Sequence, residues 1–138
     1  MARLNKKGFT IVELVIVIAV IAILAAVLIP TFSGVIQEAN ASSAQQGAAN
    51  IYKLYLADKA DEQSFTDTIV IRVGSGADAQ YIGYKDGVMN KTVYTTADAA
   101  ATGALSVANG ATYTLVTATG ETVSTETKTV GAAVTTAA

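Results

Sequence analysis

The chain has 138 residues, 9 of them basic and 11 acidic, and it contains neither cysteine nor histidine. The absence of cysteine excludes a disulfide framework and thiol chemistry. Without histidine the chain also lacks the commonest general base and transition-metal ligand, so we expect no enzyme, no bound metal and no cofactor. The net charge is −2, and the basic residues form no stripe that could contact the phosphates of a nucleic acid. Direct nucleic-acid binding is therefore not expected.

An apolar run from Phe9 to Ile29 follows a basic N-terminus and is interrupted only by Thr10 and Glu13. About 20 such residues can cross a bilayer as a helix, and the preceding positive charges predict a cytoplasmic N-terminus. A secretory signal peptide has a shorter apolar region, so an uncleaved anchor or a specialised leader is favoured. A carboxylate inside the span costs roughly 2.5–3.5 kcal/mol at a helix centre and less near the end. Glu13 is therefore a candidate functional residue that needs a partner.

Pro30 follows the apolar run, and its ring would clash with the carbonyl of Ala26 inside a helix. Helical spacing nevertheless continues beyond it, with apolar residues mostly three and four positions apart. We expect one helix from about residue 10 to about residue 57, weakened near Pro30. Its first half, residues 9–30, is apolar on every side, and its second half, residues 31–58, is amphipathic.

The remaining region, residues 59–138, is rich in β-prone runs. Asp-Gly or Thr-Gly between two such runs is typical of a hairpin turn. We expect a strand at 68–73, hairpins formed by 80–84 with 88–95 and by 112–118 with 121–130, and a short helix or a loop at 98–103. The predicted fold class is α+β, with the long N-terminal helix packed on a small antiparallel β-sheet.

The boundary of the apolar run carries the most specific motif. Residues 6–14 read Lys-Lys-Gly-Phe-Thr-Ile-Val-Glu-Leu. A plain membrane anchor explains the basic flank, but it does not explain Gly8 directly before Phe9 or the carboxylate of Glu13. The segment resembles the class III signal of the type IV pilin family, and Pro30 falls where many members carry a proline. The close resemblance covers residues 1 to about 36.

The resemblance implies that residues 1–8 are a prepilin leader. A membrane aspartic peptidase would cut the chain after the leader and N-methylate the new amine of Phe9. The residues that this enzyme would recognise are Lys6, Lys7, Gly8, Phe9 and Glu13.

The resemblance also implies a helical homopolymer, with Phe9, Glu13 and Pro30 taking part in assembly. In the filament, the carboxylate of Glu13 would pair with the Phe9 amine of a neighbouring copy. The subunit would lie in the plasma membrane with its leader in the cytoplasm, and would then enter an extracellular pilus on a bacterial surface. Its other partners would be an inner-membrane platform protein and an assembly ATPase.

Two departures from the family pattern are visible. Many pilins have glycine where this chain has Ala22, a good helix former. Opening of the helix would therefore rest on Pro30 alone, and we expect a short melted segment or only a kink. Many pilins also close a C-terminal loop with a disulfide. This chain has no cysteine, so hydrogen bonds and packing must hold its C-terminal strands.

Other candidate features have simpler interpretations. An acidic cluster follows the helix and consists of Asp58, Asp61 and Glu62, with Asp67 nearby. Such a cluster could bind a hard cation, but we favour the interpretation that these side chains are solvated at the end of the helix. Six tyrosines suggest packing, with Tyr81 and Tyr84 on opposite faces of a strand. The threonine-rich C-terminal region is typical of an exposed sheet face.

Two alternative functions remain. A pseudopilin of a type II secretion or DNA-uptake system would have the same N-terminal segment. A single-span membrane enzyme or sensor belongs to a different class, and the lack of histidine and cysteine argues against it.

Overall fold

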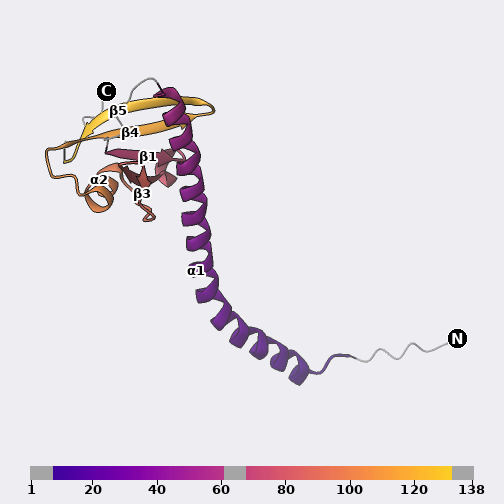
Figure 1. Ribbon diagram of the computed structural model, residues 1–138. Helices are drawn as coiled ribbons and strands as arrows, with labels where there is room; N and C mark the ends of the chain where they lie inside the picture. The colour runs from indigo at the N-terminus through magenta and orange to yellow at the C-terminus, as the bar shows by residue number, and fades with distance from the viewer. Residues whose placement is uncertain (1–7, 61–67, 132–138) are drawn as a thin grey trace, which may run out of the picture. The chain divides into compact units, whose positions relative to one another are not determined.

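The computed structural model describes residues 8–60 and 68–131 (Figure 1). The chain divides into two compact units, Met1–Ala39 and Asn40–Ala138, and each is described by itself. The elements in chain order are α1 (Ile11–Asp58), β1 (Ile69–Val73), a 3₁₀ turn η1 (Gly76–Asp78), β2 (Gln80–Lys85), β3 (Val88–Met89), α2 (Ala97–Leu105), β4 (Thr112–Thr119) and β5 (Thr122–Thr129).

The first unit contains the apolar part of α1. The predicted long helix is confirmed, and Pro30 lies inside it with helical backbone on both sides. The structure therefore shows no melted segment at this proline. Beside this proline, the hydroxyl of Thr31 donates to the carbonyls of Val27 at 3.3 Å and Leu28 at 2.8 Å. The carbonyl that the missing N–H of proline leaves without its usual donor is a different one, that of Ala26.

The second unit is a five-stranded sheet in the order β3-β2-β1-β4-β5. The predicted α+β class is confirmed, but the expectation of a wholly antiparallel sheet is wrong, because β1 and β4 pair in parallel. The reason lies in the connection between them. After β3 the chain passes through α2 before it returns beside β1 as β4, and a helical crossover of this kind joins parallel strands.

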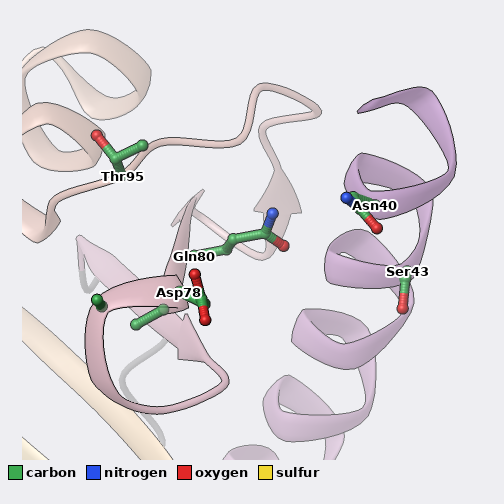
Figure 2. Close-up of a pocket in the computed structure, with 7 residues that line it drawn as sticks. Asn40, Ser43, Asp78, Gln80 and Thr95 are labelled. Atoms are coloured by element: carbon green, nitrogen blue, oxygen red, sulfur yellow. The ribbon is translucent and has the colours of Figure 1, made fainter. Parts of the chain in front are cut away.

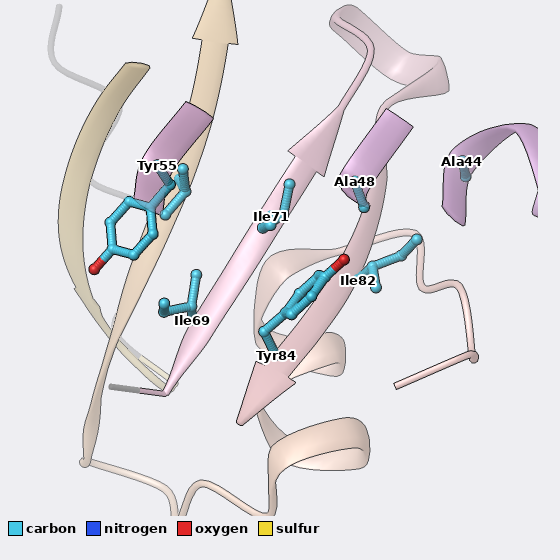
Figure 3. Close-up of a cluster of buried hydrophobic side chains, with 8 residues drawn as sticks. Ala44, Ala48, Tyr55, Ile69, Ile71, Ile82 and Tyr84 are labelled. Atoms are coloured by element: carbon cyan, nitrogen blue, oxygen red, sulfur yellow. The ribbon is translucent and has the colours of Figure 1, made fainter. Parts of the chain in front are cut away.

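Each face of the sheet carries its own core, so the central strand β1 is buried on both sides. Figure 3 shows the α1 face, where Ala44, Ala48 and Tyr55 meet strand residues including Ile71. On the other face, Val70 packs with buried residues of α2. Neighbouring residues of a strand point to opposite faces, which explains why β1 begins with three consecutive buried apolar residues, Ile69, Val70 and Ile71.

Glycine allows α2 to lie close to the sheet. A Cβ atom built on Gly83 would lie 2.8 Å from both the Ala104 Cβ and the Leu105 Cγ. Real side chains do not approach so closely, so a larger residue here would push α2 away from β2. The Ala-rich segment at 98–103, for which a helix or a loop was possible, is thus a helix with a specific packing contact.

Both predicted hairpins are present, but the second strand of the first is shorter than the predicted 88–95: β3 covers only Val88–Met89, and an isolated bridge joins Tyr81 to Tyr94. In the first, Asp86 and Gly87 have φ of 51° and 80°, as a type I′ turn requires at both central positions. In the second, Thr119 pairs with Thr122, so Gly120 and Glu121 form the loop. This loop begins one residue later than the sequence suggested, because Gly120, with φ of 63°, takes its first central position.

The tyrosines and threonines lie as predicted. Tyr84 belongs to the α1-side core and Tyr81 packs on the opposite side. The ring of Tyr52 stacks on Tyr84 with 4.3 Å between centroids, and burial, with a smaller effect of Tyr52, raises the pKa of Tyr84.

The threonines of β5 are exposed. Of the predicted acidic cluster, only Asp58 lies within the described residues, because Asp61, Glu62 and Asp67 lie outside them.

One carboxylate ties the end of the sheet to α2. The Tyr113 hydroxyl donates to Asp98 Oδ1 at 2.7 Å, and the backbone N–H of Gly131 donates to Asp98 Oδ2 at 3.1 Å. Burial and the bond to Asp98 raise the pKa of Tyr113 well above its usual range. These contacts, with the full pairing of β4 and β5, hold the C-terminal strands by hydrogen bonds and packing, as the sequence led us to expect.

Candidate assembly site at the start of helix α1

The predicted site residues lie at the beginning of α1. Gly8, Phe9 and Thr10 precede the helix without regular structure, and the Phe9 side chain is 86% exposed. Lys6 and Lys7 lie outside the described residues. The peptide bond between Gly8 and Phe9, at which cleavage is expected, therefore lies in an exposed, non-helical segment directly before the helix.

Thr10 and Glu13 cap the first turn of α1. The Thr10 N–H and hydroxyl donate to Glu13 Oε2 at 3.0 and 2.9 Å, and the Glu13 N–H donates to the Thr10 hydroxyl at 3.3 Å. This reciprocal arrangement is a capping box, which satisfies backbone donors that have no partner at a helix N-terminus. The sequence contains the signal of a capping box, a threonine followed three residues later by glutamate before an apolar run, although the cap was not among the roles predicted for Glu13.

The cap positions the carboxylate for a second interaction. Within the described residues, both hydrogen bonds to Glu13 use Oε2, so Oε1 remains open to a further donor. The carboxylate also accepts from the amide of the residue that directly follows Phe9. Removal of the leader would create a cationic amine on Phe9, one residue from that amide. A negative charge at a helix N-terminus is in addition favoured by the helix dipole.

The apolar part of α1 is uncovered. Every large apolar side chain from Ile11 to Ile36 is between 49% and 82% exposed. By length and composition the helix could cross a membrane. An apolar surface of this extent is far larger than soluble monomers expose, so this segment needs lipid or other apolar helices around it.

The described part of the second unit has a polar pocket beside α1, which Figure 2 shows (470 Å³). Asn40 and Ser43 of α1 line one side, and Asp78, Gln80 and Thr95 line the other. Its one carboxylate is too few for a hard cation, which takes several oxygen ligands. Over residues 8–60 and 68–131, no three acidic side chains come together as a metal site.

Comparison with known proteins points to one family. A model described as the prokaryotic N-terminal methylation motif matches residues 3–29. The type IV wide pilus major component PilA4 of Thermus thermophilus is 64% identical over 36 residues, which are 26% of this chain and 28% of that protein. The chain thus matches little more than a quarter of this relative's length. No solved structure matches the chain significantly. Both matches lie in the N-terminal segment, so this segment is similar to that of type IV pilins, and the structure shows an α+β unit after it.

Proposed function

We propose that the chain is a structural subunit of a type IV pilus, made as a precursor that is cut between Gly8 and Phe9. The observation that carries this proposal is the exposed apolar helix that begins at a capped carboxylate. The helix would lie in the plasma membrane first, with the leader in the cytoplasm. It would then pack against the helices of other copies in an extracellular filament.

The environment of Gly8 supports the cleavage proposal. A Cβ atom on Gly8 would meet nothing within 4 Å among residues 8–60 and 68–131, and the φ of Gly8 lies outside the range that disfavours other residues. Neither packing nor backbone conformation requires glycine here. We attribute this glycine to recognition by a peptidase, which would also read Lys6, Lys7, Phe9 and Glu13 and would methylate the new amine.

Glu13 would acquire its second partner after cleavage. The amine of Phe9 on a neighbouring subunit would bind the open side of the carboxylate, while Thr10 holds the other side. In an apolar filament core the attraction between the two charges is large, and so is the cost of leaving either charge unpaired. The pair would thus select one axial register, while apolar burial supplies most of the association free energy.

Pro30 would contribute to assembly through the backbone of α1. It has no N–H, so the Ala26 carbonyl lacks its usual helical donor. The helix is continuous through Pro30 in the single chain, and this proline is the position at which packing in a filament would most easily open it. The platform protein and the ATPase would act on the assembling helix.

Replacement of Gly8 tests the proposal. In Gly8→Leu, the fold has room for the side chain, so loss of processing would report on recognition alone. We expect the unprocessed size in the membrane fraction and no surface filaments, whereas Gly34→Ala, at another open glycine of the same unit, should be processed normally. Normal cleavage and normal filaments from Gly8→Leu would contradict the proposal. Only short assemblies from the wild-type chain, with no surface fibres, would instead favour the pseudopilin alternative.

A further inference from the structure

Strand β5 forms a long open edge of the sheet. The strand order ends at β5 (Figure 1), so in the described part of the chain Thr122–Thr129 has a strand neighbour on one side only. The short strand β3 forms the opposite edge of the sheet. The backbone groups along an open edge can pair with another strand, and proteins usually place isolated charges or prolines there to prevent such pairing.

The charges on β5 have a different pattern. The strand carries Glu126 and Lys128, which lie opposite Leu115 and Tyr113 of β4 and therefore share the α2 face of the sheet. Their side chains form an ion pair of 3.1 Å and are 65% and 40% exposed. Glu126 and Lys128 lie on the same face with one residue between them. When two such strands run antiparallel, the acid of each strand can lie opposite the base of the other, so the pattern is complementary to itself.

We propose that β5 pairs antiparallel with β5 of a second copy of this chain, about a two-fold axis at Thr127. In this register each Glu126 lies directly opposite the partner's Lys128. Thr127 lies opposite itself, and Thr125 lies opposite Thr129. Each charge then has an opposite charge both along its own strand and across the new pair, which stabilises cross-strand contacts.

The charges also exclude the neighbouring registers. An axis at residue 126 places two glutamates opposite each other, and an axis at residue 128 does the same with two lysines. Like charges directly opposite destabilise a strand pair. Axes further along the strand leave both charges without an opposite partner.

The contact is small, and repetition along a filament would strengthen it. It overlaps only residues 125–129 of each strand, and exposed ion pairs are individually weak. The inference rests on the proposed function at this point: subunits along one filament are related by a helical operation, so a two-fold contact joins copies in two different filaments. Repetition along both filaments would raise the effective concentration and bind them side by side.

The absence of cysteine from the chain allows a direct test that requires neither cleavage nor filaments. In the full chain in detergent, Thr127→Cys should form a disulfide-linked dimer under mild oxidation, because opposite residues of an antiparallel pair lie about 4.5–5.5 Å apart at Cα, within disulfide range. Thr125→Cys is the matched control on the same face of the strand. In this control, the two copies of position 125 would lie roughly 13 Å apart along the strands, too far for a disulfide. The disulfide-linked dimer should therefore be at least about tenfold less abundant than with Thr127→Cys.

Charge reversal in the Thr127→Cys chain then tests the register. Glu126→Lys and Lys128→Glu should each reduce the disulfide-linked dimer severalfold, while an equimolar mixture of the two should form mixed dimers at the original level. Glu121→Lys makes the same charge change in the hairpin loop, outside the overlap, and should have no effect. Equal linking of the Thr125→Cys and Thr127→Cys chains, or no recovery in the mixture, would overturn the inference. Since this readout does not use Gly8 or filaments, it stands or falls separately from the proposed function.

Discussion

The amide nitrogen of Thr10 lies 3.0 Å from Glu13 Oε2 at the first turn of α1. The acidic residue that interrupts the apolar segment thus has a structural role before any other subunit is present. It caps its own helix, and the cap holds the carboxylate beside the backbone that follows Phe9. Besides this cap, which the structure shows, the same side chain would take part in the charge pairing proposed for a filament.

The cap predicts a measurable effect of Thr10. Thr10→Ala removes the hydroxyl that both donates to and accepts from Glu13. Loss of an N-cap costs about 1 kcal/mol, so amide exchange in the first turn of α1 should become roughly fivefold faster in detergent. Thr10→Ser retains a hydroxyl and should exchange at the wild-type rate. Identical exchange in the alanine and serine variants would contradict the capping role.

Thr31 should keep α1 helical at Pro30. Thr31→Val has nearly the same shape but cannot donate to the carbonyls of Val27 and Leu28. We expect faster amide exchange in the turns around Pro30 and little change elsewhere in the helix. Thr31→Ser restores the hydroxyl and serves as the control. If the valine variant protects these amides as well as wild type does, another interaction maintains the helix.

The close packing of α2 predicts a cost for a single methyl group. Gly83→Ala places a Cβ 2.8 Å from Ala104 Cβ, and such overpacking typically costs about 1–3 kcal/mol. Denaturant unfolding of the full chain in detergent should show this loss. Gly34→Ala adds a methyl group in open space within a helix and should be neutral or slightly stabilising. Equal stability of the two variants would show that α2 moves without cost.

The bond between Tyr113 and Asp98 predicts a response to alkaline pH. Because the pKa of Tyr113 in the folded chain lies above its ordinary value of 10.0, the folded state retains this proton when the unfolded state has lost it. The stability that the folded state gains from protonated Tyr113 is therefore complete below pH 10.0, the ordinary pKa of tyrosine, and is lost as the pH rises above it. Tyr113→Phe should be less stable at neutral pH by about 1–2 kcal/mol, and its stability should fall less between about pH 9 and about pH 12. Urea unfolding across this range tests both, and an unchanged alkaline slope would contradict the assignment.

The features that sequence predicted well depend on local signals. The hairpin at Asp86-Gly87 follows from residues that tolerate positive φ, and the long helix follows from the spacing of its apolar residues. The parallel pairing of β1 with β4 was missed because it depends on where α2 packs, through contacts such as that with Gly83, and these are distant in sequence. At Pro30 the sequence left open a short melted segment or only a kink, and the structure has helical backbone on both sides of the proline.

The candidate site was predicted in part. The motif at residues 6–14 predicts Gly8, Phe9 and Glu13 as site residues, and their role stays a prediction; the structure shows only that they lie at the start of α1. The contact between Thr10 and Glu13 was overlooked although its spacing is visible in the sequence. The partner proposed for β5 depends on strand order, which shows that this strand has an open edge.

The most direct test of the charge-pairing account compares Glu13→Gln with Glu13→Ala by filament yield and by the mass of the processed subunit. Glutamine retains a side-chain oxygen that can complete the capping box, but it carries no charge for the amine of Phe9. Glu13 is one of several residues that the peptidase would read, and Gly8 and Phe9 at the cut are unchanged, so the account predicts that both variants are still cut after Gly8. It also predicts that both yield at least about tenfold fewer filaments than wild type, as expected when a charge in an apolar core loses its partner. Wild-type filament yield from Glu13→Gln would contradict it, since the carboxylate would then be needed only as a helix cap.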